Sequence, residues 1–239
     1  MKPYYQDKRV TIYHGDCREI LPTLPKVDLV LTDPPYGINA VYGDSYDDNA
    51  TAYWEWFIPT LQQMRNAASV VILTHKVSAL HHLTDWDWVG VWNKPWSSGA
   101  RLGNSPVLPH WEPIFMYGIH TIGVKTEYIP DVLSYNPVPT GGRGGYMGRE
   151  AWKKSKANGH PTPKPTELLT RLITAFSPAD GFTLDPFLGS GTTCYCAKKL
   201  NRYSIGIEIE EKYCEIAARR CSQEVMDFGE LSRPIEEIG

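Results

Sequence analysis

Apolar positions along the chain fall into short β-branched runs that alternate with amphipathic stretches of helical spacing. The runs predict strands at Val10–Tyr13, Val27–Thr32, Ser69–Thr74, Trp86–Trp92, Pro113–Tyr117, Phe182–Leu184 and Tyr203–Ile209. The amphipathic stretches predict helices at Thr51–Ala67, His75–Leu83, Thr166–Phe176, Ser190–Leu200 and Glu210–Cys221. The strands at 86–92 and 113–117 lie too close together for a crossover helix, so we expect an antiparallel pair there. The pattern as a whole predicts an α/β fold with a mostly parallel sheet.

Two polar, turn-rich stretches interrupt this alternation. Gly37–Asn49 follows a Pro-Pro pair, and Ile119–Gly159 holds the glycine-rich run Pro139–Gly148. A gap of that length inside a compact α/β domain is usually a functional insert or a mobile segment. We therefore expect one domain built from residues 1–118 and 160–222, with an insert at 119–159 and a tail at 223–239.

Composition and charge narrow the class of protein. The chain has 239 residues, 42% of them hydrophobic, and a net charge of −3, which excludes a polybasic, histone-like protein. No apolar run approaches the ~20 residues of a membrane span, and the first ten residues contain no apolar signal region. The cysteines form no CxxC pair, so we expect reduced thiols, no metal site and a cytoplasmic enzyme; they are Cys17, Cys194, Cys196, Cys214 and Cys221.

The run Asp185–Thr193 (DPFLGSGTT) joins a predicted strand to a predicted helix through a Gly-x-Gly turn. Glycines permit a sharp turn close to a ligand, and the helix start offers free N–H groups. Glu208 ends the next strand, near the ~20-residue spacing at which an acid meets a ribose in nucleotide-binding folds. Cys194 stands at the third glycine position of the dinucleotide pattern, which argues against a nicotinamide oxidoreductase.

The tetrapeptide Asp33-Pro34-Pro35-Tyr36 also follows a predicted strand, at the edge where open α/β sheets bind ligands. The prolines fix the backbone and remove two N–H donors, so that carbonyl oxygens can face a ligand. With the Asp33 carboxylate and the Tyr36 ring, this set suits a planar group that bears an NH₂. A rigid turn capped by Asp33 is the alternative, and Pro-Pro alone would favour it.

Together, these motifs resemble the S-adenosylmethionine-dependent amino DNA methyltransferases. The order DPPY, then His160–Pro165 (HPTPKP), then DPFLGSG is similar to the circularly permuted beta class of that family. The resemblance covers nearly the whole chain, at Gly15–Cys17, Asp33–Tyr36, Trp92–Lys94, Trp111–Pro113, His160–Pro165, Asp185–Thr193 and Ile205–Glu208.

The resemblance implies a Rossmann-like methyltransferase fold, with a seven-stranded sheet in the order 3-2-1-4-5-7-6. Val10–Tyr13 would be the third strand and Phe182–Leu184 the first. Residues 1–118 would form the catalytic half of the domain, 119–159 a small target-recognition insert and 160–222 the cofactor-binding half.

The resemblance also assigns roles to residues. Asp33, Pro34, Pro35 and Tyr36 would be catalytic. The cofactor S-adenosyl-L-methionine would have its methionine part near Asp185, Phe187, Gly189, Ser190 and Gly191, with Asp33 and Thr192 as further cofactor contacts. Glu208 would hold the ribose, Asp16 and Cys17 the adenine edge, and Thr162 and Lys164 the carboxylate. For Lys164, an exposed loop charge remains an equal alternative.

The implied reaction methylates an exocyclic amine in double-stranded DNA, by base flipping and direct in-line transfer. Asp at the first motif position is typical of adenine-N6 enzymes, whereas Ser is commoner in cytosine-N4 enzymes. We therefore expect adenine, with cytosine-N4 transfer and a catalytically inactive DNA-binding protein as alternatives. Stacking of Tyr36 on the base predicts that Tyr36→Phe is tolerated. A homodimer and a companion restriction endonuclease remain open as partners, and a membrane is not expected.

The insert carries a surplus of three positive charges in a chain of net charge −3. This basic island predicts contacts with DNA phosphates, although a solvated loop would have the same composition. The candidate DNA-binding residues are Arg143, Arg149, Lys153, Lys154 and Lys156.

Overall fold

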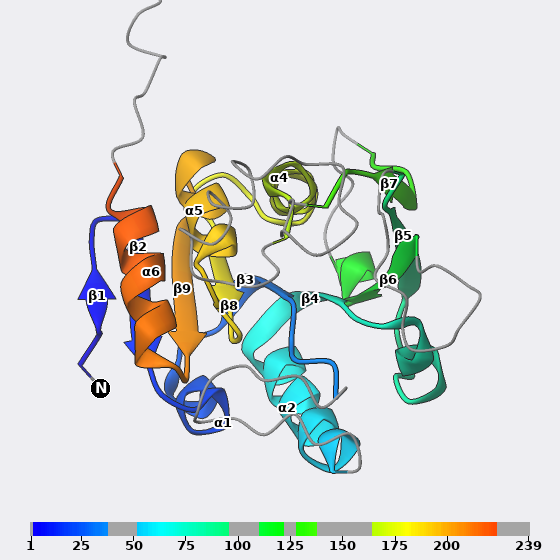
Figure 1. Ribbon diagram of the computed structural model, residues 1–239, viewed down its shortest axis with the longest axis horizontal. Helices are drawn as coiled ribbons and strands as arrows, with labels where there is room; N and C mark the ends of the chain where they lie inside the picture. The colour runs from blue at the N-terminus through cyan, green and yellow to red at the C-terminus, as the bar shows by residue number, and fades with distance from the viewer. Residues whose placement is uncertain (1, 38–51, 96–109, 122–127, 138–163, 224–239) are drawn as a thin grey trace, which may run out of the picture.

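The computed structural model describes residues 2–37, 52–95, 110–121, 128–137 and 164–223. These residues form a nine-stranded sheet with helices on both faces (Figure 1). The strands are β1 (Tyr5–Gln6), β2 (Val10–His14), β3 (Val27–Thr32), β4 (Ala68–Thr74), β5 (Trp88–Asn93), β6 (Trp111–Tyr117), β7 (Val132–Ser134), β8 (Phe182–Asp185) and β9 (Tyr203–Glu208). The helices are α1 (Cys17–Ile20), α2 (Tyr53–Ala67), α4 (Thr166–Phe176), α5 (Thr192–Lys199) and α6 (Glu211–Cys221), with short 3-10 helices η1 (Leu21–Thr23), η2 (Val77–His81) and η3 (Ile119–Thr121).

The strand order is β1-β2-β9-β8-β3-β4-β6-β5-β7. The seven strands predicted from the sequence occur in the predicted order, since β2, β9, β8, β3, β4, β6 and β5 correspond to 3-2-1-4-5-7-6. β6 runs antiparallel to both β4 and β5, which confirms the predicted antiparallel pair. The edge strands β1 and β7 were not predicted, because two and three residues are too few to show a period.

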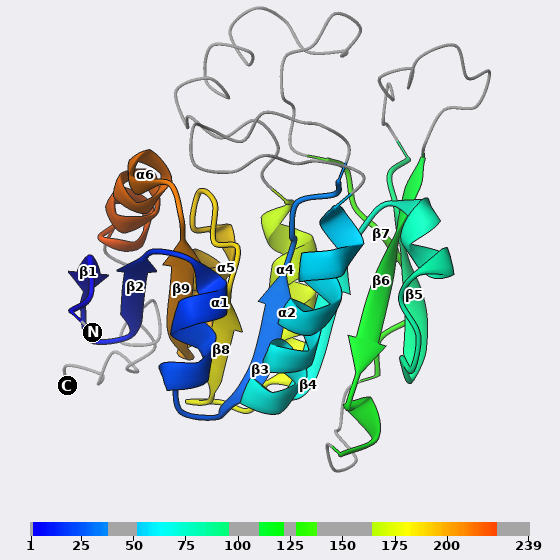
Figure 2. The same ribbon diagram turned by 90° about the horizontal axis from the view of Figure 1, so that it is seen from below.

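Side chains alternate between the two faces of the sheet. Leu29 and Leu31 of β3 pack with α4 on one face, whereas Val30 packs with α1 and α2 on the other. Figure 2 shows α1 and α2 in front of the sheet and α4 and α5 behind it. A sheet covered on both faces needs apolar residues at successive positions, which explains the continuous apolar runs in the sequence.

Three local differences separate the structure from the sequence prediction. The helix expected at His75–Leu83 is the 3-10 helix η2, and His75 itself is fully buried before it. The helix expected from Ser190 begins at Thr192, because Gly191 adopts a left-handed conformation with φ +79°. β7 lies within the segment expected as an insert, where it pairs with β5 and buries Leu133.

All five cysteines are free and buried. Among the described helices, none has both the length and the apolar character that a membrane span requires. The same described ranges contain no cluster of side chains suited to hold a metal ion.

Candidate active site

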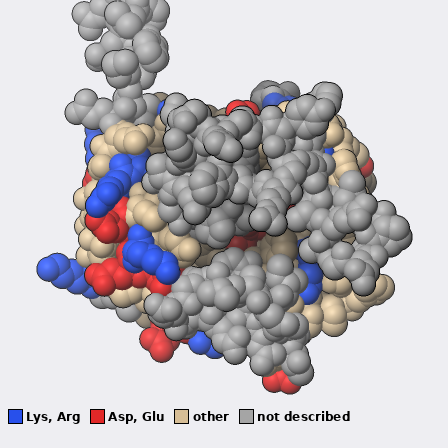
Figure 3. All heavy atoms as spheres, viewed as in Figure 1, with Lys and Arg blue, Asp and Glu red and all other residues tan. Residues whose placement is uncertain are grey.

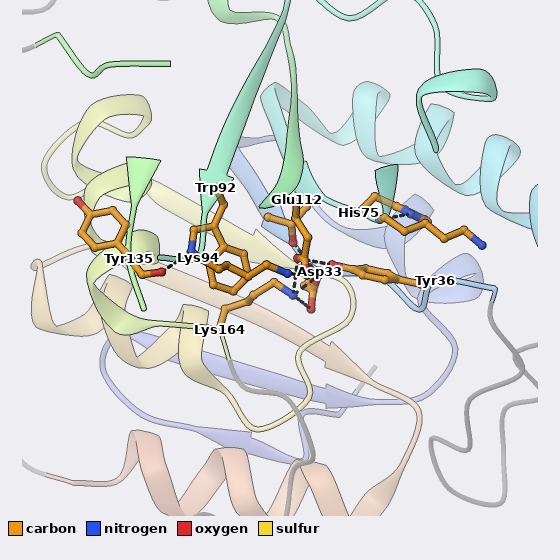
Figure 4. A network of polar contacts seen from close by, with 10 residues as sticks. Asp33, Tyr36, His75, Trp92, Lys94, Glu112, Tyr135 and Lys164 are labelled. Atoms are coloured by element: carbon orange, nitrogen blue, oxygen red, sulfur yellow. Dashed lines mark hydrogen bonds and ion pairs between the residues drawn. The ribbon is translucent and has the colours of Figure 1, made fainter. Parts of the chain in front are cut away.

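Several strands present polar side chains at the same edge of the sheet. Asp33 follows β3, Thr74 ends β4, and Lys94 follows β5. Glu112 lies at the start of β6, which reaches this edge because β6 runs antiparallel to β4. Asp185 and Glu208 end β8 and β9. Because β6 runs opposite to the neighbouring strands of this mostly parallel sheet, Asp33, Lys94 and Glu112 lie close together, as Figure 4 shows.

The carboxylate of Asp33 accepts hydrogen bonds from three side chains. Thr74 Oγ1 and Tyr36 Oη donate to Oδ1 over 2.6 and 2.8 Å. Lys164 Nζ donates to Oδ2 over 2.6 Å. Both carboxylate oxygens of Asp33 are therefore already engaged as hydrogen-bond acceptors.

Glu112 is a second carboxylate in contact with the same groups. Its Oε1 accepts from Lys94 Nζ over 2.8 Å, and its Oε2 accepts from Tyr36 Oη over 3.0 Å. Lys164 Nζ lies 3.6 Å from Oε2. Burial acts to raise the pKa of Glu112, but Lys164 and Lys94 outweigh it and hold that pKa below its usual value. Two ammonium groups and two carboxylates thus form one compact cluster.

The side chain of Lys164 is largely buried by this arrangement. Desolvation acts to lower its pKa, and the carboxylates of Asp33 and Glu112 more than compensate, so the pKa is raised. The Trp92 ring lies 5.3 Å from Lys94 Nζ and 5.5 Å from Lys164 Nζ. The ring face therefore adds a cation–π contact to each ammonium.

The Tyr36 ring stacks on His75, with ring centroids 4.7 Å apart. Lys76 donates its backbone N–H to His75 Nδ1 over 2.8 Å, so Nδ1 carries no proton. His75 Nε2 therefore carries the proton and faces Tyr53 Oη at 2.8 Å. Burial, with Lys76 and Lys164 nearby, lowers the pKa of His75 to about 3, so the imidazole is neutral. Burial and the two carboxylates raise the pKa of Tyr36 well above its usual value.

The neighbouring strands β8 and β9 build a different kind of site. Asp185 Oδ1 accepts from Thr32 Oγ1 over 2.6 Å and from the Phe187 N–H over 3.1 Å. Glu208 accepts the N–H of Gly189 over 2.8 Å and that of Glu210 over 2.9 Å. Burial raises the pKa of Asp185 to about 6 and also raises that of Glu208.

The glycine turn between β8 and α5 is tightly packed. Gly189 and Gly191 have φ values of +53° and +79°, which side chains rarely adopt. A Cβ on Gly191 would lie 2.8 Å from the Cβ of Ala217. Arg220 donates to the hydroxyls of Ser190 and Thr192. The backbone of this turn is consequently fixed, whereas Phe187 beside it is only partly buried.

The structure brings most of the predicted residues to this edge of the sheet. Pro34 is buried beside Asp33, and Pro35 is partly buried. Asp16 caps α1 by accepting the Arg18 N–H over 2.9 Å, and Cys17 is buried in the first turn of that helix. The alternative of an exposed loop charge is wrong for Lys164, whose side chain is 11% exposed.

The remaining predicted site residues lie outside the described residues. These are Thr162 and the candidate DNA-binding residues Arg143, Arg149, Lys153, Lys154 and Lys156. On the face in Figure 3, basic and acidic side chains are interspersed near α6. There Lys212 pairs with Glu210 and Arg219 with Glu215, so α6 presents both signs of charge together.

Sequence reasoning assigned no role to Glu112, Lys94, Thr74 or His75. Glu112 and Lys94 do stand in the segments Trp111–Pro113 and Trp92–Lys94, which carried part of the family resemblance. A charged residue at the end of an apolar strand was the available signal. The antiparallel pairing of β5 and β6 then places both of them at the edge that holds Asp33.

Comparison with known proteins gives consistent matches. The family model N6_N4_Mtase, described as DNA methylase, matches residues 132–219. The Type II methyltransferase M2.DpnII of Streptococcus pneumoniae is 48% identical over 256 residues, which cover 93% of each chain. The Type II methyltransferase M.ScaI of Streptomyces caespitosus is 28% identical over 95% of this chain and 86% of its own.

Two solved structures share the fold. The M1.HpyAVI–SAM complex has a TM-score of 0.62 and 22% identity, covering 90% of this chain and all of the other. The cytosine-N4-specific PvuII DNA methyltransferase has a TM-score of 0.65 and 16% identity, covering 96% and 92%. The predicted Rossmann-like methyltransferase fold is thereby confirmed.

Proposed function

This chain belongs to the DNA methylase family of Type II methyltransferases, and from that premise we propose that it methylates the exocyclic N6 amine of adenine in double-stranded DNA. One observation carries the proposal. The Asp33 carboxylate and the glycine turn after Asp185 follow the paired strands β3 and β8, at the same edge of the sheet. The hydrogen bond from Thr32 to Asp185 joins the two strand ends directly.

The residues around the glycine turn suit S-adenosyl-L-methionine. Each carboxylate oxygen of Glu208 accepts one backbone N–H, which leaves a lone pair on each for the two ribose hydroxyls. Gly191 has no room for a Cβ because Ala217 of α6 lies against it, so the packing of α6 fixes the shape of the turn beside the proposed cofactor site. When bound, this cofactor supplies an electrophilic methyl group on a sulfonium.

Other cofactor contacts remain proposals. Asp16 and Cys17 would meet the adenine edge of the cofactor, and Phe187 would cover its methionine part. Thr162 and Lys164 would hold its carboxylate. Lys164 Nζ already contacts Asp33, so a cofactor carboxylate would share this ammonium with the catalytic motif.

In the proposed mechanism, Asp33 and the carbonyl of Pro34 accept the two hydrogens of the target amine. This favours a pyramidal nitrogen with a localised lone pair, aligned for in-line attack. The target base must leave the duplex to reach these groups. Tyr36, whose ring already stacks on His75, would stack on the flipped base. Alignment of this kind can supply ~7–11 kcal/mol of the barrier reduction, and the methylated nitrogen then loses its proton readily.

The choice of adenine over cytosine rests on Asp33 at the first position of the motif. The fold does not discriminate, because the cytosine-N4-specific neighbour shares it. An intact DPPY motif argues against an inactive binding protein. We also infer the circularly permuted beta class, because Asp33–Tyr36 precedes Asp185–Thr193 in the chain. Arg143, Arg149, Lys153, Lys154 and Lys156 remain the proposed DNA contacts, and a homodimer and a companion endonuclease remain proposed partners.

The test is base-resolved detection of modified bases in DNA treated with the purified chain and S-adenosylmethionine. We expect N6-methyladenine within one sequence context, and none with Asp33→Ala. N4-methylcytosine would replace the adenine assignment, and no modification of either base would refute methyl transfer to DNA.

A further inference from the structure

Two hydrogen-bond donors in the cluster lie between two carboxylates. Tyr36 Oη is 2.8 Å from Asp33 Oδ1 and 3.0 Å from Glu112 Oε2. Lys164 Nζ is 2.6 Å from Asp33 Oδ2 and 3.6 Å from the same Glu112 oxygen. Figure 4 shows both groups converging on the two carboxylates. Each donor therefore has a second acceptor within reach.

The sharing of these two donors affects how the Asp33 carboxylate can bind the target amine. Asp33 already accepts from Thr74, Tyr36 and Lys164. A hydroxyl has one proton, so Tyr36 donates to one carboxylate at a time. Oδ1 already accepts two donors, Thr74 and Tyr36, so an amine that approaches this oxygen competes with them, whereas Oδ2 accepts Lys164 alone. A displaced donor without a new partner would carry the desolvation cost of an unmade hydrogen bond.

We propose that Glu112 is a positioning residue that takes over the Tyr36 hydroxyl and the Lys164 ammonium when Asp33 binds the target amine. This inference rests on the proposed function. Lys94 holds the other oxygen of Glu112 at 2.8 Å, so Oε2 stays turned towards both shared donors. The transfer needs no proton movement between residues, since each donor only changes its acceptor.

The first experiment compares Glu112→Ala and Glu112→Gln in single-turnover methylation. Loss of a charged acceptor should reduce the rate roughly 10- to 100-fold in Glu112→Ala. Glu112→Gln keeps an acceptor oxygen for Tyr36, so its loss should be smaller. Affinities for S-adenosylmethionine and for DNA should change little in both variants, because Glu112 acts at the amine-binding step.

The matched control is Asp28→Ala. Asp28 lies near the start of β3 and accepts the N–H of Phe182 at the start of β8, at the opposite end of these strands from the candidate site. This variant tests whether the loss of a carboxylate far from the candidate site also slows the reaction. We expect a normal single-turnover rate for Asp28→Ala, and thermal unfolding curves report whether each variant is folded.

The second experiment is a double-mutant cycle with Tyr36→Phe. That change removes the hydroxyl that competes for Asp33, so Glu112→Ala should cost several-fold less in the Tyr36→Phe background. Strictly multiplicative effects, or a normal rate for Glu112→Ala, would overturn the role of Glu112. If the wild-type chain methylates cytosine instead, the adenine assignment fails, yet the same rate ratios still decide the inference. A wild-type chain that transfers no methyl group would overturn both.

Discussion

The two halves of the functional edge hold their carboxylates by opposite means. Around β3–β6, Asp33 and Glu112 are paired with the side chains of Lys164 and Lys94, and the pKa of Glu112 is lowered. Around β8 and β9, Glu208 accepts two backbone N–H groups, Asp185 accepts one together with the Thr32 hydroxyl, and burial raises the pKa of both.

This difference assigns separate tasks to the halves. Side-chain partners can exchange, which suits a site where a substrate amine must find free acceptors. A backbone N–H is held in position by the fold, which suits a site that must keep one shape for a ligand. Substitutions around β3–β6 should therefore lower the rate of turnover, and substitutions around β8 and β9 should lower the affinity for the cofactor. The following measurements test that division.

The largest effect is expected for Asp33→Ala. Removal of the acceptor at the reacting centre should lower the single-turnover rate by about 10²–10³-fold or more. Cofactor affinity measured by calorimetry should be nearly unchanged, because Glu208 and the glycine turn remain. A large loss of cofactor affinity would show that the two halves are not separable.

Glu208→Ala tests the other half. Loss of a charged hydrogen-bond partner costs ~1.5–3 kcal/mol, so cofactor affinity should fall roughly 10- to 100-fold. DNA affinity without cofactor should be preserved. Unchanged cofactor affinity in calorimetry would mean that other residues hold the ribose.

The raised pKa of Asp185 predicts a pH dependence of stability. Its folded-state pKa of about 6 exceeds the ordinary 3.8, so the folded protein binds the proton more tightly. Stability should then fall as pH rises from about 4 to 6, by up to ~1.4 kcal/mol per pH unit. The measurement is urea unfolding of the wild type against Asp185→Asn, which lacks the titrating group. Parallel pH profiles of the two proteins would contradict the raised pKa.

The smallest effect is expected for Tyr36→Phe. If the Tyr36 ring only stacks on the target base, the variant should keep the wild-type rate. The Tyr36 hydroxyl, however, contacts both Asp33 and Glu112. We expect a loss of about 3- to 10-fold in single-turnover rate, corresponding to ~0.5–1.5 kcal/mol for one hydrogen bond. If the single-turnover rate of Tyr36→Phe equals that of the wild type, the Tyr36 hydroxyl has no role in the reaction and only the ring contributes.

The sequence predicts the centre of the sheet well because β3, β4 and β9 are buried on both faces and read as apolar runs. The glycine turn is equally visible, since φ values of +53° and +79° favour glycine. The pairing of Lys164 with Asp33 joins residues 131 positions apart, and no local period carries that information. His75 was assigned to a helix because its packing against Tyr36 arises only in the folded chain.

The cluster of Asp33, Glu112, Lys94 and Lys164 sums to zero formal charge. Its field therefore falls off quickly with distance, and its ion pairs are too close together for mobile ions to screen them. DNA binding through phosphates weakens steeply as salt is added. Raising ionic strength should thus lower the affinity for DNA while the rate of the bound complex, measured at saturating DNA, stays nearly constant.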